Sequence, residues 1–154
     1  MSKIFREIII VVGKVILKMT NCKSHILYNP EKNRILIVDD DYDIIVYFKT
    51  ALEESGFNVE VFTDPLEALA KFKSDYYDLL LIDIRMPRLD GFELYKKLRK
   101  RDVKFKVCFI TSFGTYYEAM IEEHPSIKKE LNCFIRKPIT TIDLLKCIKG
   151  ILHE

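Results

Sequence analysis

The sequence lacks the features that would place it at once in a special class of protein. No apolar run approaches the roughly 20 residues of a membrane-spanning helix, and no internal repeat is visible along the 154 residues. The formal net charge is only +2, so overall charge does not favour nucleic acid as a partner. With 49% hydrophobic and 31% charged residues, the composition is that of an ordinary globular domain with a short appendage.

Closely spaced cysteines are also lacking. The four cysteines, Cys22, Cys108, Cys133 and Cys147, are far apart and include no C-x-x-C motif. Three of them lie inside apolar runs, which is typical of reduced, buried thiols in a cytoplasmic protein. We therefore expect no disulfide framework.

Positive charge gathers at the start of the chain. Residues 1–33 hold six Lys/Arg and two Glu, whereas residues 34–154 hold nineteen basic and twenty-one acidic groups. The stretch IIIVVGKVIL is interrupted by Lys14 and followed by no small-residue cleavage site, so it does not fit a signal peptide. Wound as a helix, residues 3–19 would be two-faced, which permits contact with a membrane surface or a partner. The alternatives are a loosely ordered leader, or an upstream start codon with Met19 as the true first residue.

We therefore divide the chain into a leader and linker over residues 1–33 and one domain over residues 34–154. Within that domain short apolar runs alternate with amphipathic segments. The predicted strands are 34–39, 57–63, 78–83, 105–111 and 133–136. The predicted helices are 42–56, one opened by Asp64-Pro65, 91–101, one around 116–124, and a last one after Thr140 and Asp143. Five β-then-α units predict an α/β fold, a doubly wound parallel sheet with helices on both faces.

Polar residues follow the apolar runs at the predicted strand ends. The first strand ends in Asp39, Asp40 and Asp41, and the third ends in Asp83. The fourth ends in Thr111, and Lys137 follows the fifth. In open α/β sheets, ligands bind beyond the carboxyl ends of the strands, where the strand order reverses.

These residue types suit phosphoryl chemistry. Carboxylates that converge on one edge repel unless they share a cation, and oxygen ligands with room for water suit Mg²⁺. A lysine and a hydroxyl on neighbouring strands can pair with phosphoryl oxygens. A carboxylate can form an acyl phosphate, and Asp83 is central among the strand ends.

Residues 34–153 resemble the receiver domain of two-component response regulators. The matching residues are the acidic pair Asp39 and Asp40, the D-x-x-M-P-x-x-D-G signature Asp83, Met86, Pro87, Asp90 and Gly91, then Thr111, Phe134 and Lys137-Pro138. The resemblance implies a five-stranded flavodoxin-like fold with strand order 2-1-3-4-5. It also implies a cis peptide bond before Pro138.

The resemblance implies a role for each matching residue. Asp83 accepts a phosphoryl group from a histidine kinase or phosphotransfer protein, with Thr111 and Lys137 assisting. Mg²⁺ is bound by Asp83, by Asp40 directly and by Asp39 through water, and the backbone carbonyl of Arg85 completes the set. Thr111 and Phe134 form the switch. Pro87, Gly91 and Pro138 are structural.

The implied protein is a cytoplasmic phosphoacceptor with slow autodephosphorylation, not a dedicated enzyme. Because the sequence ends at Glu154, soon after the last predicted helix, we expect a stand-alone domain that signals through an output protein. Direct DNA binding is not expected. The basic run over 96–106 ends a predicted helix, where cations complement the helix dipole.

Some positions depart from the family pattern. Thr111 and Lys137 are 26 positions apart, and the extra residues fall around 124–129. Phe134 replaces the commoner tyrosine and has no hydroxyl. Arg85 and Phe113 stand at the positions that tune the lifetime of the acyl phosphate, where bulky side chains obstruct water.

Two alternatives remain. One is a pseudo-receiver that serves only as an adaptor, although that class normally lacks acidic residues that are present here. The other is a haloacid-dehalogenase-type phosphatase that uses Asp39 and Asp41 as a D-x-D pair. It would leave the signature around Met86 and Pro87 unexplained, and Asp41 also suits a helix N-cap.

Overall fold

The computed structural model describes residues 33–112, 122, 127 and 133–153, and its core is one parallel sheet. The strands are β1 (Arg34–Val38), β2 (Asn58–Phe62), β3 (Leu79–Asp83), β4 (Lys106–Thr111) and β5 (Cys133–Arg136). Their order is β2-β1-β3-β4-β5, and every pairing is parallel. The predicted fold class and strand order are confirmed.

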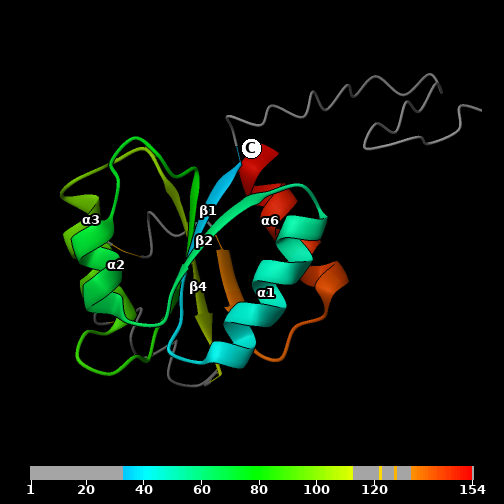
Figure 1. Cartoon of the computed structure of the whole chain (residues 1–154), viewed down its shortest axis with the longest axis horizontal. Coiled ribbons are helices and arrows are strands. Elements are labelled where there is room, and N and C mark those ends of the chain that lie inside the picture. Colours follow the sequence, from blue (N-terminus) through cyan, green and yellow to red (C-terminus); the bar gives the residue numbers. More distant parts are fainter. Residues whose placement is uncertain (1–32, 113–121, 123–126, 128–132, 154) are drawn as a thin grey trace, which may run out of the picture.

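Helices cover both faces of the sheet. They are α1 (Tyr42–Glu54), α2 (Pro65–Lys71), α3 (Gly91–Arg99) and α6 (Thr141–His153). Figure 1 shows α2 and α3 on one side of the sheet, with α1 and α6 on the other. The predicted leader, the helix around 116–124 and the extra residues around 124–129 lie outside the described residues. The division at residue 33 stays a prediction.

The sheet divides the core into two layers. All five residues of β3 are buried, which explains why its sequence is a continuous apolar run that does not alternate. Leu80 and Ile82 pack with Phe92 and Phe109 toward α2 and α3. Leu79 and Leu81 pack on the other side with the buried face of α1 and α6. Because both faces are dry, polar groups are confined to the ends of this strand.

Side-chain caps start the helices where the sequence predicts them. Asp41 Oδ1 accepts from the N–H groups of Asp43 and Ile44 at the start of α1. Asp64 and Asp90 cap α2 and α3 in the same way. At α6 the Thr140 hydroxyl accepts from the Asp143 N–H at 3.2 Å. Each cap satisfies a backbone donor that the helix cannot pair internally.

The basic end of α3 is used within the domain. The Arg99 guanidinium lies over the rings of Tyr95 and Phe105 and donates to the carbonyl oxygens of Val103 and Phe105. Arg101 donates to the carbonyl of Leu69. Part of the basic run over 96–106 therefore holds the α3–β4 connection in place.

The two ends of the described domain lie together, away from the carboxyl ends of the strands. β1 begins at Arg34, and α6 ends at the same edge of the sheet, where the Lys106 ammonium at the start of β4 donates to the Ile151 carbonyl. Figure 1 shows the last turn of α6 beside the first residues of β1.

The prediction of unpaired thiols is wrong for two cysteines. Cys108 is buried with a free thiol, and burial raises its pKa. Cys133 of β5 and Cys147 of α6, however, are joined in a disulfide. Sequence spacing could not reveal this pair because it depends on how α6 packs against β5.

None of the helices in the described part of the chain is both long and apolar enough to cross a bilayer.

Gly91 lets two backbone segments approach closely. A Cβ atom at Gly91 would lie 2.2 Å from the carbonyl oxygen of Asp83. At Gly150 in α6, by contrast, an added Cβ would meet nothing within 4 Å.

We therefore expect Gly91→Ala to lower the free energy of unfolding by more than about 2 kcal/mol, because backbone must move to admit the methyl group. Gly150→Ala is the matched control. It should raise the free energy of unfolding by about 0.5–1 kcal/mol through helix propensity. Urea unfolding followed by circular dichroism measures both. Equal effects of the two substitutions would contradict the close approach at Gly91.

Candidate functional site

The register of the sheet brings the predicted site residues to one edge. Val38 of β1 pairs with Ile82 of β3, so Asp39 and Asp83 follow side by side. Asp83 pairs with Ile110 of β4, which places Thr111 one residue beyond it. The next pairing joins Thr111 to Arg136, so that Lys137 comes directly after. The site also lies where the strand order reverses, since β1 is flanked by β2 and β3.

Three carboxylates meet at this edge. Asp39, Asp40 and Asp83 each offer one oxygen atom, and these atoms all lie within 4.8 Å of one another. Asp39 is fully buried, Asp83 is 6% exposed, and Asp40 is exposed. The cluster is thus open to solvent on the Asp40 side and closed at its base.

Lys137 bridges the two buried carboxylates. Its Nζ lies 2.6 Å from Asp39 Oδ2 and 2.9 Å from Asp83 Oδ1. Its backbone N–H donates to the Thr111 carbonyl at 2.8 Å, which fixes the chain beside β4. Burial disfavours the ammonium, but the hydrogen bonds and charges of the two aspartates outweigh burial and raise the pKa of Lys137. The predicted cis peptide bond between Lys137 and Pro138 is confirmed.

Burial determines how Asp39 titrates. Burial raises its pKa to about 6, although the contacts with Lys137 and with the Asp41 N–H lower it. Its Oδ1 accepts from the Asp41 N–H at 3.0 Å. The partner of the buried Asp39 Oδ2 is the Lys137 ammonium, 2.6 Å away.

Asp83 is held by the loop that follows it. Its Oδ2 accepts from the Arg85 N–H at 2.7 Å, and its Oδ1 receives the Lys137 ammonium. Burial raises the pKa of Asp83, and the hydrogen bond from Lys137 opposes that rise. The Gly91 N–H closes the loop by donating to the Ile84 carbonyl at 2.9 Å. Asp83 is therefore fixed in orientation yet close to the open side of the cluster.

The acid cluster fits a hard cation. Three carboxylates converge here on the single ammonium of Lys137, so the cluster keeps an excess of negative charge that a positive ion would stabilise. Oxygen-only donors with one solvent-facing side suit Mg²⁺, which keeps several of its waters. The Arg85 N–H donates to Asp83, and the role of the Arg85 carbonyl as a metal ligand stays a prediction.

The two predicted switch residues lie on neighbouring strands. Thr111 ends β4 and is 2% exposed. Phe134 in β5 pairs with Phe109 and is half-buried against the α2–α3 layer of the core. Phe113 lies outside the described residues.

Of the three consecutive acids that follow β1, Asp41 is the one that does not belong to the carboxylate cluster. Its carboxylate is engaged by the N–H groups at the start of α1. A haloacid-dehalogenase-type phosphatase would need Asp41 as a general acid next to the nucleophile Asp39. The capping role of Asp41 therefore counts against a phosphatase of that type.

Sequence reasoning missed the bridge itself. It assigned Lys137 to a phosphoryl group and Asp39 to a water on the metal, whereas the structure pairs them directly at 2.6 Å. The sequence carried a signal only for the Asp83 half of the bridge, because Lys137 follows β5 and the strand two places away, β3, ends in Asp83.

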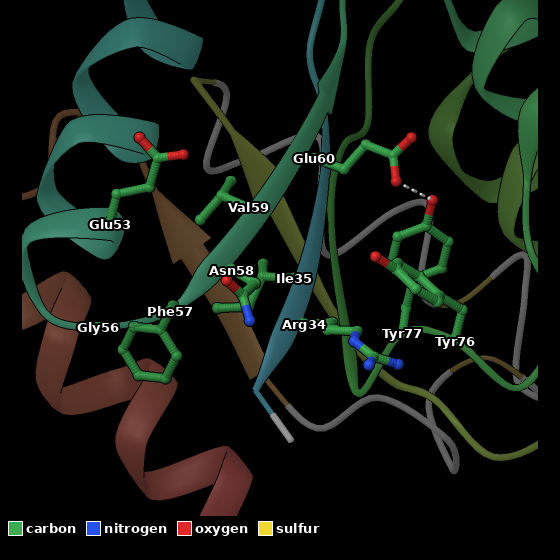
Figure 2. A pocket seen from close by; sticks show the side chains of 10 residues that line it. All are labelled: Arg34, Ile35, Glu53, Gly56, Phe57, Asn58, Val59, Glu60, Tyr76 and Tyr77. Atoms are coloured by element: carbon green, nitrogen blue, oxygen red, sulfur yellow. Dashed lines mark hydrogen bonds between the residues drawn. The ribbon is translucent and has the colours of Figure 1, made fainter. Parts of the chain in front are cut away.

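A separate hollow of about 670 Å³ lies at the opposite end of the strands. Figure 2 shows it between β2, the end of α1 and the pair Tyr76 and Tyr77. Two pairs of its side chains are engaged with each other, since the Tyr77 hydroxyl donates to Glu60 at 2.7 Å and the Arg34 guanidinium lies over the Tyr76 ring. Despite its size, we do not take this hollow as the functional site, because no cluster of acidic or basic groups of its lining converges on one point.

Comparison with known proteins agrees with this geometry. A family model described as the response regulator receiver domain matches residues 35–149. Sensor protein EvgS of Escherichia coli strain K12 is 34% identical over 125 residues, which cover 81% of this chain and 10% of EvgS. The response regulator receiver protein CpdR of Brucella abortus is 33% identical over 119 residues, covering 77% of this chain and 96% of CpdR. The chain thus spans a tenth of EvgS and nearly all of CpdR.

Solved structures show the same likeness. A CheY-like response regulator receiver domain protein from Methanospirillum hungatei superimposes with a TM-score of 0.69 at 34% identity, over 79% of this chain and 94% of that one. The response regulator TrrA of Thermotoga maritima, crystallised in complex with Mg(2+)-BeF, superimposes with a TM-score of 0.66 at 29% identity, over 78% of this chain and 99% of that one.

The raised pKa of Asp39 predicts how stability depends on pH in the presence of a chelator. Unfolded, Asp39 titrates near 3.9; folded, its pKa is about 6. The folded protein therefore holds the proton more tightly, so its stability falls as pH rises from about 4 to 6. Relative to wild type, Asp39→Asn should gain on the order of 2–3 kcal/mol in free energy of unfolding across that window.

Chemical unfolding at half-unit pH steps measures this difference, with Asp41→Asn as the control at an exposed acid of the same strand end. Parallel stability curves for wild type and Asp39→Asn between pH 4 and 6 would show that burial does not shift Asp39.

Proposed function

Because the chain belongs to the family of response regulator receiver domains, we propose that Asp83 accepts a phosphoryl group from the phosphohistidine of a histidine kinase or phosphotransfer protein. The observation that carries the proposal is the Lys137 ammonium held between the Asp39 and Asp83 carboxylates, 2.6 Å and 2.9 Å away. It places a fixed positive charge beside an ionisable acid at the open edge of the sheet.

Phosphoryl transfer forms a bond between an Asp83 carboxylate oxygen and phosphorus and breaks the bond between phosphorus and the donor imidazole. The Arg85 N–H and Lys137 orient the Asp83 carboxylate before the reaction. As negative charge develops on the phosphoryl oxygens, the Lys137 ammonium can stabilise it, because the ammonium already lies next to an oxygen of Asp83. Thr111 donates its hydroxyl hydrogen to a phosphoryl oxygen.

Asp39, Asp40 and Asp83 are the residues that would hold Mg²⁺, with the Arg85 carbonyl as a fourth protein ligand. When bound, the ion neutralises charge on the transferring phosphoryl group. The similar receiver TrrA, which was crystallised with Mg(2+)-BeF, supports this assignment. Asp39 Oδ2 is already paired with the Lys137 ammonium, and Asp39 stays ionised because the ammonium and the ion together offset the cost of burial.

The phosphorylated state is read by another protein. Phosphoryl oxygens at Asp83 draw the Thr111 hydroxyl toward them, and half-buried Phe134 turns into the vacated space. A modification shifts a two-state equilibrium only by its differential interaction with the two states. One charge-assisted hydrogen bond plus the Lys137 ion pair supply on the order of 2–4 kcal/mol, enough to populate a minor conformation.

The protein acts in the cytoplasm as a phosphoacceptor that loses its phosphoryl group slowly, and it does not bind DNA directly. The runner-up is a pseudo-receiver adaptor. Against it stands the complete set of Asp39, Asp40, Asp83, Thr111 and Lys137 at one edge.

Incubated with acetyl phosphate and Mg²⁺, the protein should gain one acid-stable, hydroxylamine-labile phosphoryl group. Asp83→Asn should abolish the labelling because the amide cannot form the acyl phosphate. Asp41→Asn is the matched control and should label normally, since Asp41 caps α1. Intact mass spectrometry measures both. Full labelling of Asp83→Asn, or loss in Asp41→Asn alone, would move the nucleophile to another residue.

Asp40→Ala should remove Mg²⁺ binding, whereas Asp90→Ala should retain it. Asp40 belongs to the carboxylate cluster, while Asp90 caps α3 with its side chain on the Glu93 N–H. Isothermal titration calorimetry with MgCl₂ compares the two variants with wild type. If both variants lose binding to the same extent, the ion is not held by the cluster at Asp40.

A further inference from the structure

Three cysteines meet on the opposite face of the sheet from Phe134's core layer. Cys108 of β4 and Cys133 of β5 are register partners, and Cys147 of α6 packs over them. Their sulfur atoms all lie within 4.8 Å of one another. The cluster therefore draws one sulfur from each of three elements that are adjacent only in the folded domain.

The backbone at this cluster is set wider than a disulfide requires. The Cα atoms of Cys133 and Cys147 lie 7.3 Å apart, whereas disulfide-bonded cysteines usually have Cα atoms about 4.4–6.8 Å apart. Two thiolates on one zinc ion, each about 2.3 Å from the metal in tetrahedral geometry, lie about 3.8 Å from each other. The backbone therefore leaves room for Cys133 and Cys147 sulfur atoms that are not bonded to each other. Cys108 already supplies a third sulfur nearby.

The chemistry of the cluster is opposite to that of the acid site. Its donors are sulfur alone, and its surroundings are apolar side chains. The neighbours in this layer of the core are Ile110, Ile135, Leu144 and Ile148. Soft sulfur ligands select Zn²⁺ and related thiophilic ions, whereas carboxylate oxygens select Mg²⁺.

We propose that in the reduced protein Cys108, Cys133 and Cys147 bind one thiophilic divalent cation, with Zn²⁺ as the natural occupant. A dithiol reductant first converts the Cys133–Cys147 disulfide to two thiols and is itself oxidised to a disulfide. The ion then replaces three thiol protons, which are released to solvent. The fourth position of the ion is left for water, on the side of Cys133 and Cys147, which are only partly buried, whereas Cys108 is fully buried.

The test uses Co²⁺ as a spectroscopic substitute for Zn²⁺. The full chain is reduced under anaerobic conditions, freed of reductant and titrated with Co²⁺. We expect sulfur-to-cobalt charge-transfer absorption that saturates at one ion per chain. One equivalent of Zn²⁺ should abolish it, and a large excess of Mg²⁺ should leave it unchanged.

Variants assign the ligands. Cys108→Ala and Cys147→Ser should each lose the charge-transfer absorption, while Cys22→Ser, the fourth cysteine, should retain it. Asp40→Ala should also retain it, which separates this site from the acid cluster. Circular dichroism and labelling by acetyl phosphate show whether each cysteine variant is folded. If Cys108→Ala does not fold, Cys147→Ser decides the question, because Cys147 is only partly buried.

Absence of the absorption from the reduced wild-type chain would overturn the proposal. So would its persistence in Cys147→Ser, its loss in Cys22→Ser, or a Cys133–Cys147 bond that the dithiol cannot reduce.

Discussion

The ion pairs of Lys137 with Asp39 and Asp83 are the interaction on which this edge of the domain depends. Two carboxylates at the end of adjacent buried strands would repel each other in a dry setting, and neither could stay ionised without a partner. Lys137 arrives from β5, beyond β4, and its backbone is tied to Thr111. One ammonium thereby connects β1, β3 and β5 across the sheet.

The rest of the fold supports that arrangement. β3 is central and buried on both faces, so it can end in Asp83 only where the sheet opens to solvent. Gly91 allows the loop after Asp83 to return against the Asp83 carbonyl, and Asp90 starts α3 directly behind it. The acid is thus held by a short loop between two rigid elements, which is a suitable frame for a residue that reacts.

Much of this could be predicted from sequence because parallel strands align their ends. Once residues 34–38 and 79–83 are identified as strands, Asp39 and Asp83 must lie together, and Thr111 and Lys137 follow from the same rule. The direct pairing of Lys137 with Asp39 could not be predicted, since it depends on how far the lysine side chain reaches past β4 and β3. The Cys133–Cys147 contact escaped for a related reason, because it is set by the packing of a helix on a strand and leaves no period in the sequence.

Both ends of the described domain lie at the end of the sheet away from the acids, with the start of β1 near the end of α6 (Figure 1). A chain that enters and leaves at one pole can be inserted into a longer polypeptide without covering the opposite pole. A domain with this geometry can therefore be carried by polypeptides of very different length. This accords with the matching stretch being 10% of EvgS and 96% of CpdR. A fluorescent protein or surface anchor attached at either end would likewise leave the reactive edge accessible.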